Sequence, residues 1–219
     1  NTKYEEEKPI DTVQLQTNNI IEDKYVIKDM IPRGIVYKTY IVAENEDGMY
    51  LIDQHAAAER VNYEKCLKKI LNPTIETIPL LIPISIELPR NEYIVVKNHL
   101  DLLESIGIKC EEFGENTFIV RSHPTWLHEN VEKQDIEKIF ELIAHNESFD
   151  KNKFIDHAAA TMACRMSIKA NDYITLDEAK YLLDCLRQCD NPFNCPHGRP
   201  TIITYTKYDL EKMFKRVMD

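Results

Sequence analysis

The chain has 219 residues, 43% of them hydrophobic and 29% charged, a composition that predicts one compact domain or two small ones with apolar cores. A formal net charge of −10 excludes strong binding of nucleic acid by the surface as a whole, so such a contact would need a local basic patch or a partner. The sequence has no apolar run of about 20 residues and no basic-then-apolar leader, which predicts a soluble cytoplasmic protein without membrane contact.

The N-terminal part of the chain predicts a linker followed by a β-hairpin. Residues 1–19 are mostly polar and charged and begin with Asn1 instead of a methionine, as expected for a linker remnant from a longer protein. The β-rich run 34–43, the polar turn 44–48 and the apolar run 49–53 then predict two strands joined by a turn.

A helix is predicted directly after this hairpin. Apolar residues recur at spacings of seven, four and three across residues 55–71, and Pro73 ends the segment. His55 and Glu59 are four positions apart, so they project from one side of the helix, one turn from each other. Glu64 comes five positions later, so it points to another side of the helix. It could be a solvated or salt-bridged carboxylate, or it could belong to a site.

Residues 78–152 differ in character from the segments on either side. Extended segments at a sheet edge, rather than helix, are favoured around four prolines: Pro73, Pro79, Pro83 and Pro89. A helix near residues 92–106, a strand at residues 117–121 and an acidic helix near residues 132–144 follow. These elements predict an inserted, external αβ subdomain.

The C-terminal part predicts further helices and one strand. Residues 153–170 are rich in alanine and helical in pattern. Thr175 and Glu178 form a capping box at the start of the next helix. An apolar strand at residues 201–205 and a last helix at residues 208–217 complete the chain.

Together these elements predict an α+β fold with two subdomains. Residues 20–77 and 153–219 would form one discontinuous subdomain with a mixed or antiparallel sheet, because the hairpin and its helix need the C-terminal helices to complete a core. Residues 78–152 would form the external, regulatory subdomain. Apolar residues on the strands at 35–43 and 201–205 are left uncommitted, so a two-fold homodimer is expected to bury them.

Two groups of potential metal ligands stand far apart in the sequence. The first offers carboxylate and imidazole donors: Asp53, His55, Glu59 and Glu64. The second is softer: Cys164, Cys195 and His197. Such a mixture of N, O and S donors suits zinc. The six cysteines are too sparse and uneven for a disulfide scaffold, so reduced thiols are expected.

Each group also has a simpler interpretation. A His and a Glu four apart usually mark a solvated helix face, and a Cys-x-His loop can hold a buried thiol and a backbone-bonded imidazole. A closed, structural zinc knuckle is another alternative, with four ligands: Cys185, Cys189, Cys195 and His197. Against it, the first two of these cysteines lie among the apolar positions of a helix.

Three separated motifs give the sequence a family resemblance. Residues 53–64 read DQHA, two residues, Glu, four residues, Glu; residues 163–165 read Ala-Cys-Arg; and residues 195–200 read Cys-Pro-His-Gly-Arg-Pro. In this order they resemble the endonuclease motif and its companion elements in the C-terminal domain of the DNA mismatch repair protein MutL, in lineages that nick DNA. The resemblance spans nearly the whole chain and points to the bacterial, homodimeric branch.

The resemblance implies a metal-dependent endonuclease that nicks one strand of duplex DNA in mismatch repair. It implies a structural or regulatory Zn²⁺, a catalytic Mn²⁺ or Mg²⁺, and six ligands, of which the first three are also the catalytic candidates: Asp53, His55, Glu59, Cys164, Cys195 and His197. Arg199 and Lys65 are the candidate DNA contacts. The alternative is a non-catalytic dimerisation and docking module with a structural zinc site.

The resemblance also implies partners. These are a second copy of the chain, an N-terminal ATPase domain of the same chain, the replication sliding clamp, a mismatch-recognition protein and duplex DNA bound weakly, in a nucleoid-associated location. The segment expected to bind the clamp contains Ile78, Leu81 and Pro83. Ile78 stands where relatives have Gln, so the segment departs from the family pattern.

Overall fold

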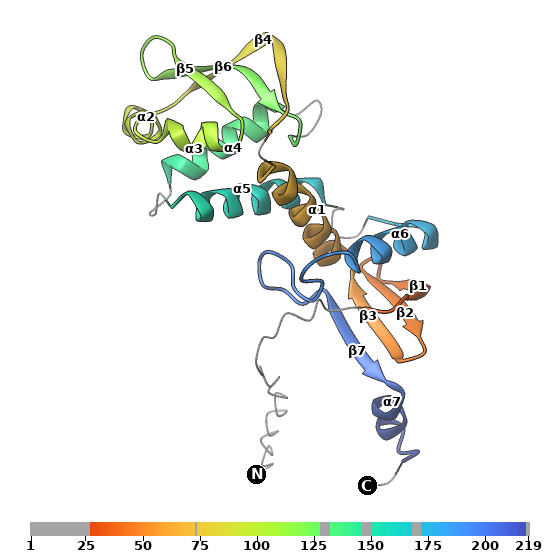
Figure 1. Ribbon diagram of the computed structural model, residues 1–219. Coiled ribbons are helices and arrows are strands. Elements are labelled where there is room, and N and C mark those ends of the chain that lie inside the picture. The colour runs from red at the N-terminus through yellow and green to blue at the C-terminus, as the bar shows by residue number, and fades with distance from the viewer. Residues whose placement is uncertain (1–26, 73, 128–131, 146–149, 168–171, 218–219) are drawn as a thin grey trace, which may run out of the picture.

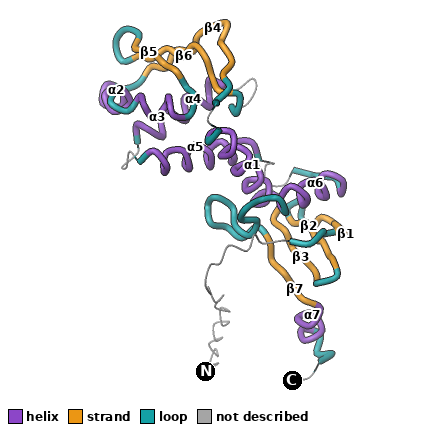
Figure 2. The backbone as a smooth tube through the Cα atoms, in the orientation of Figure 1, coloured by secondary structure: helices purple, strands orange, loops and turns teal. Residues whose placement is uncertain are grey.

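The computed structural model describes residues 27–72, 74–127, 132–145, 150–167 and 172–217. It combines helices with two antiparallel sheets, so the predicted α+β class is confirmed. The sheets lie toward opposite ends of an elongated molecule, and helices α1 (Gln54–Ile70) and α5 (Lys151–Met166) lie between them (Figure 1, Figure 2). The linker predicted for residues 1–19 lies outside the described residues.

The first sheet has the strand order β1-β2-β3-β7, and every neighbouring pair is antiparallel. Its members are β1 (Ile31–Val36), β2 (Tyr40–Asn45), β3 (Gly48–Asp53) and β7 (Ile202–Thr206). The predicted hairpin is confirmed as the pair β2 and β3.

The single strand predicted for residues 34–43 is wrong, because a turn separates β1 from β2. Tyr37 and Lys38 both have a φ of 53°, and the backbone N–H of Thr39 donates to the carbonyl of Val36 at 3.1 Å. The turn contains no Gly, Pro or Asn, the residues that usually signal one.

The two faces of this sheet have different environments. On one face, Ile41 and Ile52 are fully buried in a core with α1 and with helix α6 (Leu176–Leu186). On the other face, strand register places Val42 opposite Leu51 and Leu51 opposite Ile203, all of them partly or fully exposed. One row of apolar side chains therefore faces away from the core.

The second sheet has the order β4-β6-β5, also antiparallel. Its strands are β4 (Thr77–Glu87), β5 (Lys109–Glu112) and β6 (Thr117–Pro124). The pairing of β4 with β6 shifts register between Pro79 and Ile84. The strand predicted at residues 117–121 is confirmed and extends three residues further.

Three helices accompany this sheet: α2 (Arg90–Lys97), α3 (Leu100–Ser105) and α4 (Glu132–Ala144). The bounds predicted for α4 are confirmed. The one helix predicted near residues 92–106 is instead two, because the chain turns at Asn98 and His99, whose backbone N–H groups donate to Ile94 and Val96.

A second apolar core lies beneath the second sheet. The ring of Phe118 stacks on Tyr93 with centroids 4.7 Å apart and lies 5.6 Å from Phe140. Cys66 of α1 and Phe154 of α5 belong to the same core, so these two helices complete it. We propose that residues 78–152 form the external unit and that α1 and α5 join it to the rest of the chain.

The C-terminal elements follow the sequence patterns with shorter bounds. The capping box of Thr175 and Glu178 at the start of α6 is confirmed. The last helix is α7 (Lys207–Met213), shorter than the predicted 208–217 because Lys215 has a φ of 53°. None of the residues of α7 is buried.

The Phe118 contacts predict which apolar residue stabilises the second core. Phe118→Ala removes a fully buried ring and its two aromatic neighbours, so the free energy of unfolding should fall by about 3–5 kcal/mol. Urea denaturation measures it. Phe113→Ala, on an exposed ring beyond β5, is the matched control and should change stability by less than about 0.5 kcal/mol. Equal losses in the two variants would contradict this assignment.

Candidate metal centre

The centre begins at the junction of β3 and α1, where Asp53 is the N-cap of the helix. Its Oδ1 accepts hydrogen bonds from the backbone N–H groups of His55 at 2.9 Å and Ala56 at 3.0 Å. Aspartate is a preferred N-cap because its carboxylate satisfies otherwise unpaired helix donors. The acidic residue that ends the buried strand therefore also starts the helix.

Glu59, one turn into α1, is the residue around which the other polar side chains gather. Its side chain is 1% exposed. Oε1 lies 3.2 Å from Nε2 of His55, while Oε2 lies 3.4 Å from Nδ1 of His197 and accepts a hydrogen bond of 2.7 Å from Nη2 of Arg199. The expectation that His55 and Glu59 share one side of the helix is confirmed.

A short loop brings the second group of ligands to this carboxylate. Cys195 N–H donates to the carbonyl of Arg199, and Gly198 N–H donates to the carbonyl of Cys195, both at 2.9 Å. Gly198 has a φ of 83°, a left-handed conformation that glycine adopts without strain. The resulting tight turn carries a thiol, an imidazole and a guanidinium within five residues.

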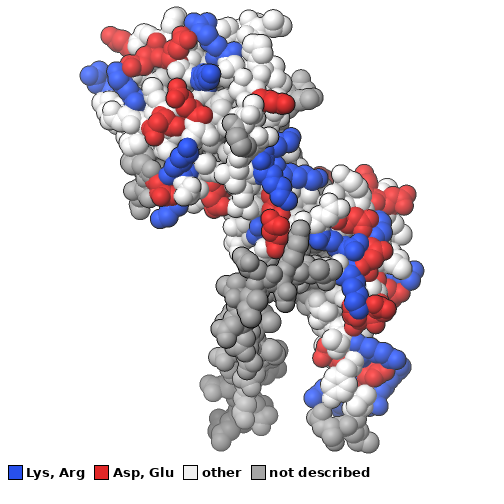
Figure 3. Space-filling model, viewed as in Figure 1, with Lys and Arg blue, Asp and Glu red and all other residues white. Residues whose placement is uncertain are grey.

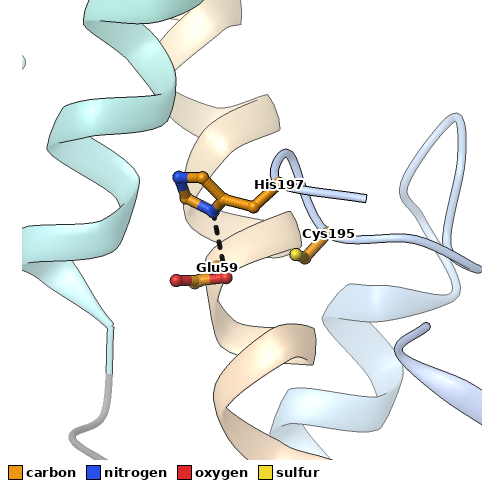
Figure 4. Close-up of side chains that lie close together, drawn as sticks. All are labelled: Glu59, Cys195 and His197. Carbon is orange, nitrogen blue, oxygen red and sulfur yellow. Dashed lines mark hydrogen bonds and ion pairs between the residues drawn. The ribbon is translucent and has the colours of Figure 1, made fainter. Parts of the chain in front are cut away.

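Among the described residues, one group of three could hold a metal ion: Glu59, Cys195 and His197. One ligand atom of each lies within 4.8 Å of the others. Figure 4 shows Cys195 and His197 reaching from the loop toward Glu59 on α1. Carboxylate oxygen, thiolate sulfur and imidazole nitrogen are donors that zinc accepts, so the chemistry of this set fits zinc.

The other residues expected at the centre lie at varying distances from this group. His55 contacts Glu59 directly, and Cys164 of α5 is close enough for Glu59 to influence its thiol. Asp53 is outside the group of three, with its Oδ1 engaged at the start of α1. Lys65 lies away from it, 3.9 Å from the sulfur of Cys185 and 5.8 Å from the ring centroid of Tyr181.

The alternative four-ligand knuckle is not assembled. Cys195 and His197 are near Glu59, whereas Cys189 is part of the apolar core under the first sheet. The sulfur of Cys189 lies 3.6 Å from the carbonyl oxygen of Cys185. Burial raises the pKa of the Cys189 thiol to about 12, which disfavours the thiolate that a metal would need.

The electrostatics of the centre depend on the charge of Glu59. Burial raises its pKa, but hydrogen bonds from Arg199 and Cys195 and the nearby His55 lower it by more, so the net pKa lies below the ordinary 4.5. The carboxyl is therefore ionised at neutral pH. The pKa of the Cys164 thiol is raised by burial and by the negative charge of Glu59.

Arg199, predicted as a DNA contact, donates a hydrogen bond to Glu59, an interaction that was not predicted from the sequence. The signal available was its position two residues after His197, inside the same six-residue motif. Its side chain remains 52% exposed, so the guanidinium is shared between the buried carboxylate and solvent. A contact with a phosphate at the same position remains a prediction.

The segment expected to bind the sliding clamp lies in β4, far from this centre (Figure 1). Leu81 is fully exposed and Ile78 is half exposed. Leu81 belongs to the stretch where β4 shifts register against β6, and Ile78 pairs with His123 just before it. Apolar side chains are thus presented outward at the end of the molecule opposite the first sheet.

Charge is mixed over the surface. Figure 3 shows Lys and Arg side chains interspersed with Asp and Glu on the face in view, without a continuous basic stripe. The mixed charges of this face and the net charge of −10 do not favour tight, sequence-independent DNA binding, which depends on an extended cationic surface. Among the described residues, no helix is both long and apolar enough to cross a membrane.

Comparison with known proteins places the chain among mismatch repair proteins. A family model described as the MutL C terminal dimerisation domain matches residues 33–174. The DNA mismatch repair protein MutL of Shouchella clausii is 45% identical over 99% of this chain and 33% of its own length. The MutL proteins of Listeria welshimeri and Anoxybacillus flavithermus are each 44% identical, over 94% and 90% of this chain and 34% and 32% of their own lengths. The chain spans about a third of the length of these relatives.

The lowered pKa of Glu59 predicts a pH-dependent contribution to stability. A carboxyl whose pKa is depressed on folding stabilises the protein above its unfolded-state pKa, and this contribution is lost as the pH falls through the folded-state value. Arg199→Gln removes the hydrogen bond that lowers the pKa most. The variant should therefore be less stable than the unsubstituted chain at pH 6, and the difference should shrink toward pH 3. Urea denaturation at both pH values tests this, and a constant difference would contradict it.

Proposed function

The chain belongs to the family of MutL C-terminal dimerisation domains, and on that premise we propose that it is a metal-dependent endonuclease domain that nicks one strand of duplex DNA in mismatch repair. The single observation that supports this proposal most is the convergence of Glu59, Cys195 and His197 from segments about 140 residues apart. Carboxylate oxygen, thiolate sulfur and imidazole nitrogen within reach of one another are the ligands that zinc accepts.

The residues of the centre would bind a divalent ion that takes part in the reaction. Glu59, Cys195 and His197 would hold Zn²⁺, with His55 completing the set from α1 and Cys164 approaching from α5. A bound divalent ion, Zn²⁺ or a catalytic Mn²⁺ or Mg²⁺, would supply hydroxide near neutral pH and would stabilise negative charge on the phosphate.

Asp53 and Arg199 have separate roles in this proposal. The Oδ1 of Asp53 is committed to the backbone of α1, so its other oxygen is the one to bind a catalytic ion or orient water. Arg199, half exposed beside Glu59, is the cation best situated to meet a DNA phosphate. Lys65 is a more distant candidate for a DNA contact, because it lies on the side of α1 that faces α6.

Recruitment by partners would compensate for the acidic surface. A domain of net charge −10 with interspersed charges binds duplex DNA weakly by itself. We propose that apolar residues of β4, the exposed Ile78 and Leu81 and the partly exposed Pro83, dock on the replication sliding clamp. The ATPase domain of the same protein and a mismatch-recognition protein would complete the assembly.

Homodimerisation would use the open face of the first sheet. Val42, Leu51 and Ile203 form an apolar row across three strands on the face opposite α1 and α6. A two-fold axis would bury this row against its copy, which removes apolar surface from water in both subunits. The exposed apolar residues of the C-terminal segment, such as Tyr208 and Phe214, are next to it in the chain.

A second candidate is a non-catalytic dimerisation and docking module with a structural zinc site. The position of Asp53 favours it, since this carboxylate lies outside the group of three and already caps α1. In that case the fold and the zinc would remain, while DNA cleavage would belong to another domain or protein.

Substitution of Asp53 separates the two candidates. Asp53→Asn keeps an N-cap of similar strength but removes the charge that a hard cation requires, so the thermal midpoint should change little. Nicking of supercoiled DNA with Mn²⁺ and the sliding clamp present should fall by more than the roughly 10 to 100-fold typical of changes outside the ligand set. A nicking rate equal to that of the unsubstituted protein would leave the docking module as the better account.

Cys195→Ala is the matched variant, and bound zinc is the quantity compared between the two. It removes a proposed thiolate ligand, so bound zinc, measured by atomic absorption after dialysis, should fall further than in Asp53→Asn. If both variants retain equal zinc, the division of roles between the two residues is wrong.

Substitution on the open face tests dimerisation. Ile203→Glu places a charge in the apolar row, so the dimer Kd should rise at least about tenfold by analytical ultracentrifugation. Phe113→Glu makes the same kind of change at an exposed ring just beyond β5 and should leave the Kd unaltered. A monomeric unsubstituted chain at micromolar concentration would count against the proposed interface.

A further inference from the structure

We propose that Arg60 and Glu64 are positioning residues that hold the loop of Cys195 and His197 in place against α1. The inference rests on the proposed metal centre and concerns how its two halves stay together. It assigns a role to Glu64, the last acidic residue of the DQHA motif, that differs from metal binding.

Glu64 is committed to the backbone that leads into the loop. Its side chain is buried, and its Oε2 accepts a hydrogen bond of 2.7 Å from the N–H of Asp190. Its Oε1 accepts one of 3.2 Å from the N–H of Asn191. Hydrogen bonds from neutral donors to an ionised carboxylate are stronger than those between neutral groups. Glu64 is not in the ligand group near Glu59.

Arg60 contacts the same loop at Asn194, four residues after Asp190. Its Nε donates to the carbonyl oxygen of Asn194 at 2.5 Å, and Asn194 directly precedes Cys195. The guanidinium is itself held in place, because Nη1 lies 3.7 Å from Oε1 of Glu64 and the group stands 5.1 Å from the ring centroid of Tyr63. An arginine with these partners is buried and has few other conformations open to it.

The contacts of Glu64 and Arg60 lie along the residues that directly precede Cys195. Glu64 fixes residues 190 and 191, Arg60 fixes residue 194, and the turn closed by Cys195 and Arg199 begins immediately afterwards. Arg60 is adjacent to Glu59 in the sequence. One turn of α1 therefore carries both a proposed ligand, Glu59, and a residue that holds the loop of the other two ligands. Ligand atoms must match metal distances within about 0.2 Å, so loss of an anchor should weaken binding without removing a ligand.

Metal binding to the 219-residue chain tests the inference. Glu64→Gln exchanges one acceptor oxygen for a donor facing the backbone N–H groups, and Arg60→Met removes the donor to Asn194 while keeping an apolar stem. The matched control is Lys68→Met, because Lys68 is exposed and lies 4.0 Å from Glu64 without touching the loop. Zn²⁺ affinity is measured by competition with a chromophoric chelator, and Co²⁺ replaces Zn²⁺ to record the thiolate-to-metal absorption band.

Glu64→Gln and Arg60→Met should each weaken Zn²⁺ binding by roughly 10 to 100-fold and shift or diminish the Co²⁺ band, whereas Lys68→Met should leave both unchanged. Amide hydrogen exchange at Cys195 and Gly198 should accelerate in the first two variants. Their effects should be less than additive in the double variant, because both residues act through one loop.

The outcomes are distinguishable. If the unsubstituted chain binds neither ion, the metal centre and this inference fall together. If it binds both and the two variants match it in affinity, Co²⁺ band and amide exchange, the positioning role alone is overturned. If Glu64→Gln does not fold, as judged by far-UV circular dichroism, Arg60→Met decides the question by the same measurements.

Discussion

The ionised carboxylate of Glu59 is the constraint on which the centre of this molecule depends. A buried charge is costly unless it is paired and hydrogen-bonded, and Glu59 sits in the middle of a helix with only 1% of its side chain exposed. Its own helix supplies His55, but the closest cation, Arg199, comes from the far end of the chain. Stable burial of this one side chain therefore requires that the C-terminal loop dock on α1. The same docking brings Cys195 and His197 to the carboxylate.

The helix that carries Glu59 also links the two halves of the fold. Val61 of α1 packs into the core under the first sheet, while Ile70, near the end of the same helix, packs into the core under the second. Arg165, the residue after Cys164 on α5, pairs at 2.5 Å with the fully buried Asp135 of α4. Helix α1, which carries Glu59, and helix α5, which carries Cys164, are thus both attached to the part of the fold that contains the second sheet. Residues of β4 pack in the same core as these two helices.

Local signals explain which parts of the fold the sequence predicts. The β2–β3 turn, the capping box of α6 and the acidic helix α4 each depend on neighbouring residues, and their positions are predicted well. The turn after β1 has none of the usual turn residues, and the break between α2 and α3 is marked in the sequence by Asn98 alone, so neither was predicted. The motifs predicted that separated ligands would meet, but the pairing of Arg199 with Glu59 and the backbone role of Glu64 depend on how a loop packs on a helix. Spacing along the chain does not contain that information.

The residue types of the loop at positions 195–200 suit its docking on α1. Its six-residue motif delivers a soft ligand, an imidazole and a permanent cation to one carboxylate, and Gly198 permits the turn that points all three the same way. The positive charge of Arg199 offsets the negative charge of Glu59, so the buried carboxylate has a cationic partner. Arg60 and Glu64 bind backbone groups of the loop and do not contact its ligand side chains Cys195 and His197. On α1, therefore, Glu59 contacts functional side chains of the loop, while Arg60 and Glu64 bind its backbone.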